Sequence, residues 1–290
     1  MKKPLISIGE LIDQSWDVYR LRFVELLSVS GWFIITAILL AVALAFYPSA
    51  TKLQVGSVLS TMETMGVLLF SLTTLLITPL LSFWLYTSLT KMLGAHFSRK
   101  QVEPKIALRE GRNVFIPTAF TSIRVMFMVL LAVVIGFGPA AIIATIGSLT
   151  NISGFIILAN LLLVVGIFVS LFLSIKWMVY YILAPLLTIL DGIRGKEALA
   201  QSRSLIEGRF WGVLFRITIP KLVFVLFGVF AMSIVGYLVG ILIDASGGIN
   251  LDIQLRISTM TQTVVPILIA TFINPLIIIS DVLLLRSLKE

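Results

Sequence analysis

The sequence contains no cysteine and a single histidine, His96. Without cysteine, no disulfide can form and no thiolate can bind a metal. One histidine in the whole chain argues against zinc and haem sites, although carboxylates could still bind Mg²⁺. We therefore expect no metal ion and no cofactor.

Charged residues are also scarce. They make up 12% of the chain, whereas about 25% is usual in a soluble domain. Hydrophobic residues account for 59%, and the mean hydropathy is +1.09. Because a soluble core cannot bury so much apolar surface, the composition predicts an all-α integral membrane protein. The net charge is +8. In a membrane protein, excess Lys and Arg set the orientation and contact anionic lipid headgroups, so we expect no nucleic-acid partner.

Several enzyme signatures are absent. The chain lacks the Gly-xxxx-Gly-Lys-Ser/Thr phosphate-binding loop, the Gly-x-Ser-x-Gly nucleophile motif and the His-Glu-xx-His zinc motif. Its start, "MKKPLISIGE", has no apolar stretch followed by small residues, as a cleaved signal peptide would have. The sequence therefore predicts a protein that is not an enzyme.

Six stretches are apolar enough to cross a bilayer, which takes about 20 residues of helix. They cover residues 25–46, 64–90, 115–137, 155–183, 217–243 and 263–285. The apolar residues 138–150 predict that the third helix ends in a re-entrant or interfacial piece. Apolar character continues from the fourth span to Leu190, so that helix must tilt, kink near Pro185 or continue along the interface.

Lysine and arginine are distributed unequally between the two sides of the membrane. With the N-terminus inside, only Lys52 and Arg256 of the 22 Lys and Arg fall in the predicted outer loops. The positive-inside rule then places both termini in the cytoplasm. The sequence predicts a multi-pass protein of the bacterial cytoplasmic (inner) membrane, with short polar outer loops.

The segment before the first span is amphipathic. Ser7 followed by Glu10 is a capping-box pattern that starts a helix. One face of this helix is mainly apolar and carries Ile8, Leu11, Ile12, Ser15, Tyr19 and Phe23. Such a helix lies in the membrane interface or packs across the cytoplasmic end of the bundle, and the two arrangements are compatible.

The opening segment has a counterpart later in the chain. "QSWDVYRLRFVELL" begins at Gln14 and "QSRSLIEGRFWGVL" begins at Gln201, and Arg22 aligns with Arg209 without gaps. A weaker third copy, "KIALREGRNVF", aligns Arg112 with Arg209. Each copy is a polar helix that leads into a span, so we predict three amphipathic interfacial helices. We expect the interfacial anchors to be Trp16, Arg22, Arg112, Arg209 and Trp211.

The second span of each predicted pair carries a Pro-Leu step, at Pro79, Pro185 and Pro275. Each proline removes a backbone donor and can kink its helix, which is either architectural or opens a cavity. The chain thus reads as one polytopic membrane domain of three repeated helix-plus-hairpin units, with chance similarity as the alternative. The domain covers residues 1–290 and the units cover residues 5–97, 101–193 and 194–288.

Four ionisable residues are candidates for a polar membrane site: Arg124, Lys176, Asp191 and Asp281. For Arg124 and Lys176 the alternative is anchoring to lipid phosphates, because their long stems can snorkel to the inner surface. Asp191 begins a turn that leads into the third amphipathic helix. A polar residue is common in a segment that links two helices, and this is the alternative explanation for Asp191. Asp281 lies about one helical turn from Arg286, so a buried ion pair or a helix-terminal contact competes with a proton or cation site.

Two segments resemble the membrane domain found in some bacterial glycerophosphodiester phosphodiesterases. They are "ISIGELIDQSWDVYRLRFVELL" and "KWMVYYILAPLLTILDGIRGKEALAQSRSLIEGRFWGV". Stand-alone inner-membrane proteins of the YciC type share this arrangement. The resemblance implies a helical membrane domain. In those phosphodiesterases catalysis belongs to a separate soluble barrel, which we expect this chain to lack, so no catalytic residue carries over.

Two functions are therefore weighed. The first is a non-enzymatic scaffold or regulatory module that engages phospholipids or partner membrane proteins. The alternative is a transporter or permease for a lipid or a small hydrophobic solute, for which a polar cavity reaching the middle of the membrane would be the discriminating observation.

Overall fold

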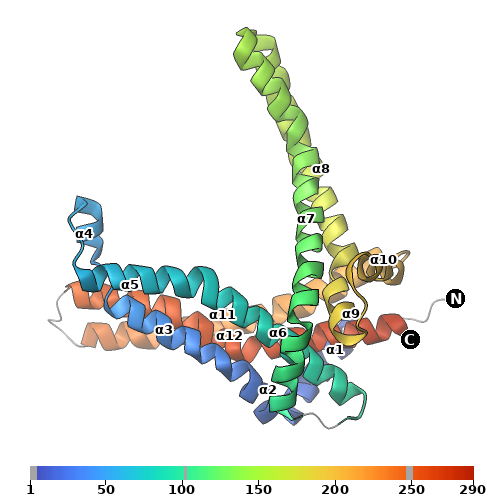
Figure 1. Ribbon diagram of the computed structural model, residues 1–290, viewed down its shortest axis with the longest axis horizontal. Coiled ribbons are helices and arrows are strands. Elements are labelled where there is room, and N and C mark those ends of the chain that lie inside the picture. The colour runs from blue at the N-terminus through green and yellow to red at the C-terminus, as the bar shows by residue number, and fades with distance from the viewer. Residues whose placement is uncertain (1–4, 101–102, 246–250) are drawn as a thin grey trace. The chain divides into compact units, whose positions relative to one another are not determined.

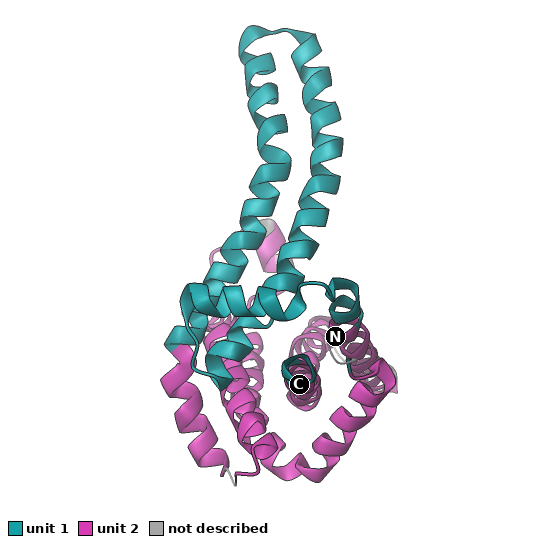
Figure 2. Cartoon of the chain, turned by 90° about the vertical axis from the view of Figure 1, so that its right-hand side faces the viewer, with its two compact units in different colours: residues 1–5, 116–215, 285–290 teal, residues 6–115, 216–284 magenta. Residues whose placement is uncertain are grey.

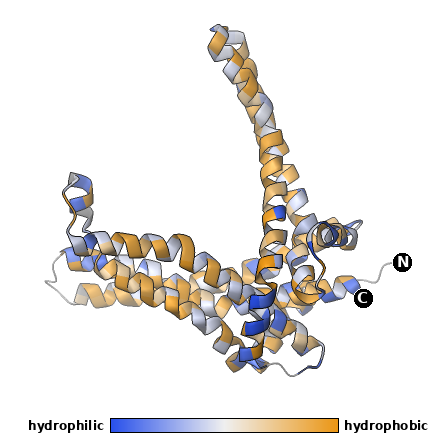
Figure 3. Cartoon of the chain, viewed as in Figure 1, coloured by the Kyte–Doolittle hydropathy of each residue, from blue (hydrophilic) through white to orange (hydrophobic). Residues whose placement is uncertain are grey.

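Six long helices dominate the computed structural model, which describes residues 5–100, 103–245 and 251–290 (Figure 1). Their apolar residues run along most of each length (Figure 3). The six helical stretches that are long and apolar enough to cross a membrane are Phe23–Ala45, Thr61–Phe97, Pro104–Thr150, Ser153–Leu190, Phe210–Ile243 and Leu251–Lys289. The predicted all-α integral membrane fold with six spans is confirmed.

All regular elements of the described residues are helical. In chain order they are α1 (Ile8–Leu21), α2 (Phe23–Ser30), η1 (Gly31–Phe33), α3 (Ile34–Ala45), α4 (Ala50–Val55), α5 (Thr61–Leu72), η2 (Thr73–Ile77), α6 (Thr78–Phe97), α7 (Pro104–Thr150), α8 (Ser153–Tyr181), α9 (Ala184–Leu190), α10 (Gly195–Ile206), α11 (Phe210–Ala245) and α12 (Leu251–Lys289). Helices α2, η1 and α3 together form the first span.

The third span is longer than predicted. Residues 138–150 are not a separate re-entrant or interfacial piece, because α7 continues without a break to Thr150 and contains Pro139. A polar segment before the span is also helical, so α7 begins at Pro104. Hydropathy marks the part of a helix that tolerates lipid, but backbone hydrogen bonding continues beyond that part wherever no residue ends it.

Two of the three repeated prolines coincide with departures from regular α-helix. Pro79 follows η2, a short π-helical turn, and stands in the first turn of α6. Pro185 stands in the first turn of α9, just after α8 ends at Tyr181. A proline in a first turn does not need its missing N–H. Pro275, in contrast, lies inside the uninterrupted α12.

The described residues form two compact units, coloured separately in Figure 2. Unit 2 comprises the described residues of 6–115 and 216–284, and unit 1 comprises the rest. Helices α7, α11 and α12 each contribute to both. This division does not follow the three predicted repeats, which remain a prediction.

The amphipathic helices α1 and α10 each pack an apolar face against protein. In α1, Leu11 and Ser15 are fully buried within unit 2, and the Ser7 hydroxyl accepts the Glu10 N–H at 3.1 Å, as the capping pattern predicts. In unit 1, α10 packs on α8 and α9, and its Ser202 hydroxyl donates to the Tyr180 carbonyl at 2.7 Å. Packing against protein is therefore observed for both helices, whereas their depth in a membrane stays a prediction.

The third predicted interfacial helix is not a separate element. It is the start of α7, where Trp84 of α6 donates to the Leu108 carbonyl at 3.1 Å. The difference lies in the glycines that the sequence aligns. Gly208 adopts a left-handed conformation with φ of 81° directly after α10, whereas Gly111 stays helical. Because Gly111 faces the Ser88 backbone so closely that a Cβ would clash, its role is close packing rather than helix termination.

Helices α7 and α8 of unit 1 approach each other at facing glycines. A Cβ added to Gly136 would lie 2.5 Å from the Gly166 carbonyl oxygen and 2.6 Å from the Ser170 Cβ. A Cβ added to Gly138 would meet nothing within 4 Å. Small residues that let backbones approach are a usual basis of helix association in membranes.

We predict that Gly136→Ala destabilises the α7–α8 hairpin by about 1–3 kcal/mol, because the new methyl group forces the helices apart. Gly138→Ala is the matched control and should be neutral or slightly stabilising, since alanine favours helix. Thermal unfolding in mild detergent measures both. Equal melting temperatures for the two variants would contradict the close packing.

Candidate functional site

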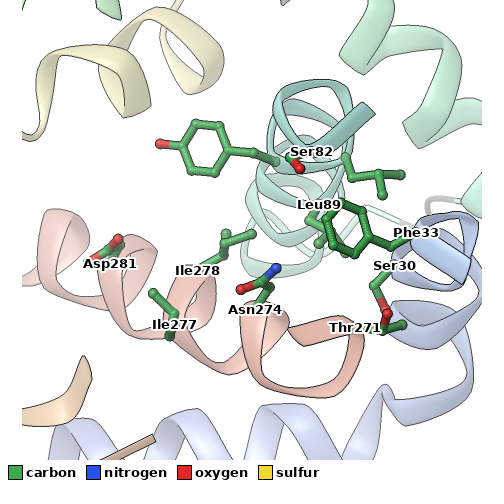
Figure 4. Close-up of a pocket in the computed structure, with 11 residues that line it drawn as sticks. Ser30, Phe33, Ser82, Leu89, Thr271, Asn274, Ile277, Ile278 and Asp281 are labelled. Atoms are coloured by element: carbon green, nitrogen blue, oxygen red, sulfur yellow. The ribbon is translucent and has the colours of Figure 1, made fainter. Parts of the chain in front are cut away.

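A partly polar cavity of about 240 Å³ lies inside unit 2. It is formed by the α2–η1 junction, by α6 and by α12, whose side chains face one another in Figure 4. Phe33, Leu89 and Ile278 contribute apolar surface. The polar side chains of the lining are Ser30, Ser82, Tyr86, Thr271, Asn274 and Asp281.

Helical spacing explains why these residues share one cavity. On α12, Thr271, Asn274, Ile278 and Asp281 follow one another at intervals of three or four residues, which places them on a single helix face. On α6, Ser82, Tyr86 and Leu89 follow the same rule, and Ser30 and Phe33 stand three residues apart. Thr271 and Ser82 lie close to the middle of their spans. The cavity therefore extends to the central part of these helices.

Two of the hydroxyls in the cavity donate to their own helices. Ser82 donates to the Thr78 carbonyl at 2.6 Å, and Thr271 donates to the Ile267 carbonyl at 3.0 Å. This local bond is the usual way in which Ser and Thr satisfy their proton within a helix in lipid. These two residues therefore need no ligand as a hydrogen-bond acceptor.

Ser30, Asn274 and Tyr86 differ from the other polar lining residues, because no side-chain hydrogen bond within the described residues engages them. The Ser30 side chain is only 3% exposed, and its hydroxyl has no hydrogen-bond partner among the described residues. Asn274 is an exposed residue of α12 that lines the cavity, and its amide likewise makes no hydrogen bond within the described parts of the chain. A buried polar group left unpaired, such as the Ser30 hydroxyl, costs about 1–3 kcal/mol. The cavity thus holds hydrogen-bonding capacity that the protein itself does not use.

Asp281 brings a charge to the cavity and is paired with Lys221 of α11. The Lys221 Nζ atom lies 2.9 Å from the Asp281 Oδ2 atom, and the two side chains are 27% and 16% exposed. A carboxylate can lie inside a helical bundle only when a partner compensates its charge. The pair joins α11 to α12 within unit 2.

Sequence reasoning selected Asp281 but missed Lys221. It pointed to Arg286 as the partner, whereas the structure provides Lys221. The available signal was the position of Lys221, which lies just inside the predicted fifth span. A second ionisable residue inside a span is itself a reason to look for an opposite charge.

The other three polar candidates belong to unit 1 and have separate surroundings. Asp191 pairs with Lys289 at 2.5 Å. Lys176 is exposed on α8, and Arg124 is exposed on α7 beside Gly195, the first residue of α10. Of the four predicted candidates, Asp281 is the one that lines the unit 2 cavity.

The expected anchors of unit 2 are Trp16 within α1, Arg22 at the end of α1 and Arg112 near the start of α7. Trp16 is 40% exposed and stacks on Tyr19, with 5.7 Å between ring centroids. Burial raises the pKa of the Tyr19 phenol, so that side chain stays neutral. Arg22, at the C-terminus of α1, pairs with Glu25 at 2.7 Å, and Arg112 is exposed on α7.

The anchors of unit 1 lie at the start of α11. Trp211 is exposed and packs edge-on against Phe210 at 5.4 Å between ring centroids, while Arg209 is half-buried. An exposed aromatic cluster beside arginine fits the membrane interface. Contact of both groups of anchors with lipid remains a prediction.

In the described ranges, no group of three or more His, Cys, Asp or Glu is placed to hold a metal ion. Comparison of the chain with protein-family models, with curated proteins and with solved structures finds no match. The cavity and its ion pair are therefore interpreted from their own chemistry.

We predict that Lys221→Met and Asp281→Asn each destabilise the protein by about 1–3 kcal/mol, because each leaves one charge without its partner. The double variant should lose less stability than the sum of the two single variants, since it removes both charges. Thermal unfolding of all four proteins in the same detergent measures this coupling. Strictly additive losses would mean that the two charges do not stabilise each other.

Proposed function

We propose that this chain is a non-enzymatic polytopic membrane protein, a scaffold or regulatory module, and that unit 2 engages a phospholipid through its cavity. The observation that carries the proposal is the pair of unpartnered polar groups, Ser30 and Asn274, in a cavity between apolar helices. A ligand for this cavity needs a polar part to complete those hydrogen bonds.

The surroundings of the cavity favour an amphiphile over a soluble ligand. Large apolar side chains such as Leu80 of α6 and Phe272 of α12 are exposed on the same helices that supply the cavity. Acyl chains can pack on such surfaces while the headgroup enters the polar lining. Phospholipids combine both parts and are present wherever a protein with six spans resides.

A permease for a lipid or small solute is the second candidate function. It is favoured by the Lys221–Asp281 pair, because charged groups inside a membrane often mark the path of a solute or ion. A scaffold needs only to hold its lipid, whereas a permease must release it on the other side. Transfer of a fluorescent phospholipid between the leaflets of proteoliposomes separates the two functions.

We also propose the bacterial cytoplasmic membrane as the location, with both termini inside. The rarity of Lys and Arg in the predicted outer loops supports this orientation. The resemblance to the membrane domain of the glycerophosphodiester phosphodiesterases and to YciC-type proteins is consistent with it. Partner membrane proteins remain part of the scaffold proposal.

The orientation is testable because the chain has no cysteine of its own. Val58→Cys, at a position that is 95% exposed between α4 and α5, should react in intact cells with a maleimide that cannot cross membranes. Ser98→Cys, exposed after α6, should react only once the membrane is opened. The reverse pattern would place the termini outside.

Lipid engagement is testable by native mass spectrometry of the protein released from its own membrane into mild detergent. We expect one phospholipid to remain bound per chain and to be lost from Asn274→Leu, which removes the free amide of the cavity. Asn160→Leu, the same change at an exposed position on α8, is the matched control and should keep the lipid. A bare wild-type protein, or equal retention by both variants, would contradict the proposal.

A further inference from the structure

The free hydrogen-bonding groups of the unit 2 cavity define what its ligand must offer. The Ser30 hydroxyl and the Asn274 amide can each donate and accept, and neither has a partner in the described residues. A ligand group that only accepts, or one that only donates, would leave half of this capacity unused. Hydroxyl groups do both, so they match the two side chains best.

The charge of the cavity disfavours an anion. Asp281 is the one charged residue among those that line it, and Lys221 already neutralises that carboxylate at 2.9 Å. A phosphate inside would lie near a carboxylate without a cation of its own, and desolvating such a group is costly. An anion is therefore disfavoured, and an ammonium group, which only donates, would leave the accepting capacity of the two side chains unused.

The size of the cavity limits the ligand group further. At about 240 Å³ it lies below the roughly 300–1,000 Å³ of pockets that enclose drug-sized molecules. Only a small part of a lipid can enter. The acyl chains must stay outside the polar lining, and the phosphate is disfavoured there by its charge as well.

Resting on the proposed lipid engagement, we propose that the cavity recognises a small hydroxyl-bearing group, as in a glycerol headgroup, with Ser30 and Asn274 as the residues that determine specificity. The hydroxyls hydrogen-bond to these two side chains and to the carboxylate of Asp281. A choline headgroup is excluded because its trimethylammonium has no N–H or O–H to donate.

The test compares two lipids that differ only in hydroxyl groups. Purified full-length protein is equilibrated in detergent with equal amounts of dioleoyl phosphatidylglycerol and dioleoyl phosphatidylpropanol, which carry the same charge, the same acyl chains and the same three-carbon headgroup. Native mass spectrometry counts which lipid is bound. We expect phosphatidylglycerol to be preferred about threefold to tenfold, as one or two additional hydrogen bonds would give.

In Ser30→Ala the two lipids should bind about equally, because the variant lacks one free hydroxyl of the cavity. Ser233→Ala is the matched control: Ser233 is exposed on α11 and donates to the Val229 carbonyl, so the preference should persist. Ser30→Cys, which keeps the side-chain size but is only a weak hydrogen-bond donor, provides a second variant should Ser30→Ala fold poorly. Thermal unfolding verifies the fold of each.

The outcomes separate this inference from the proposed function. Retention of both lipids without preference, or a preference for phosphatidylcholine added as a third lipid, overturns hydroxyl recognition but leaves lipid engagement intact. Retention of no lipid overturns the proposed function itself. If excess free glycerol abolishes the preference, hydroxyl recognition holds and the natural ligand is a soluble polyol; if the preference survives glycerol, the lipid headgroup is the ligand.

Discussion

Inside the hydrocarbon of a bilayer no water is present to bond a backbone N–H or C=O, so each span must satisfy its own backbone. Long helices follow directly from this constraint. The same need for backbone hydrogen bonds explains where the spans of this chain depart from regular α-helix. Next to Pro79 and Pro185 the α-helix gives way to a π-turn or a break, and both prolines occupy the first turn of the next helix, where no donor is missed.

The same constraint applies to polar side chains. Most Ser and Thr hydroxyls of the spans donate back to a carbonyl one turn earlier, as Ser82 and Thr271 do. Lys221 and Asp281 satisfy each other. Five hydroxyls are buried without a hydrogen-bond partner in the described residues, those of Ser30, Thr73, Thr78, Thr90 and Thr118. Of these five, Ser30 is the one that lines the cavity, where the Asn274 amide also makes no hydrogen bond within the described residues. Unused bonding capacity in a membrane is costly, and a bound ligand is the simplest way to recover it.

Helices α1 and α10 share two structural features. Each buries a serine on its packed face, Ser15 in α1 and Ser202 in α10, and each ends just before an Arg-Phe step that opens a long apolar helix. The aligned segment at the start of α7 lacks this break, because Gly111 packs against α6 instead of adopting a left-handed conformation. Similarity between the segments thus accounts for two helix-to-span junctions and not for the third.

The sequence by itself determined the class of protein and the number of spans, because apolar length and charge scarcity are local properties that lipid selects directly. It also located the start of α1 from Ser7 and Glu10. For the fourth span it left three alternatives open, and the structure shows the one with a break near Pro185. Only the tertiary structure decided that Asp281 pairs with Lys221 and that Ser30 and Asn274 share a cavity. These residues come from helices distant in the chain, and the choice of facing partners depends on the rotation of each helix, which hydropathy does not encode.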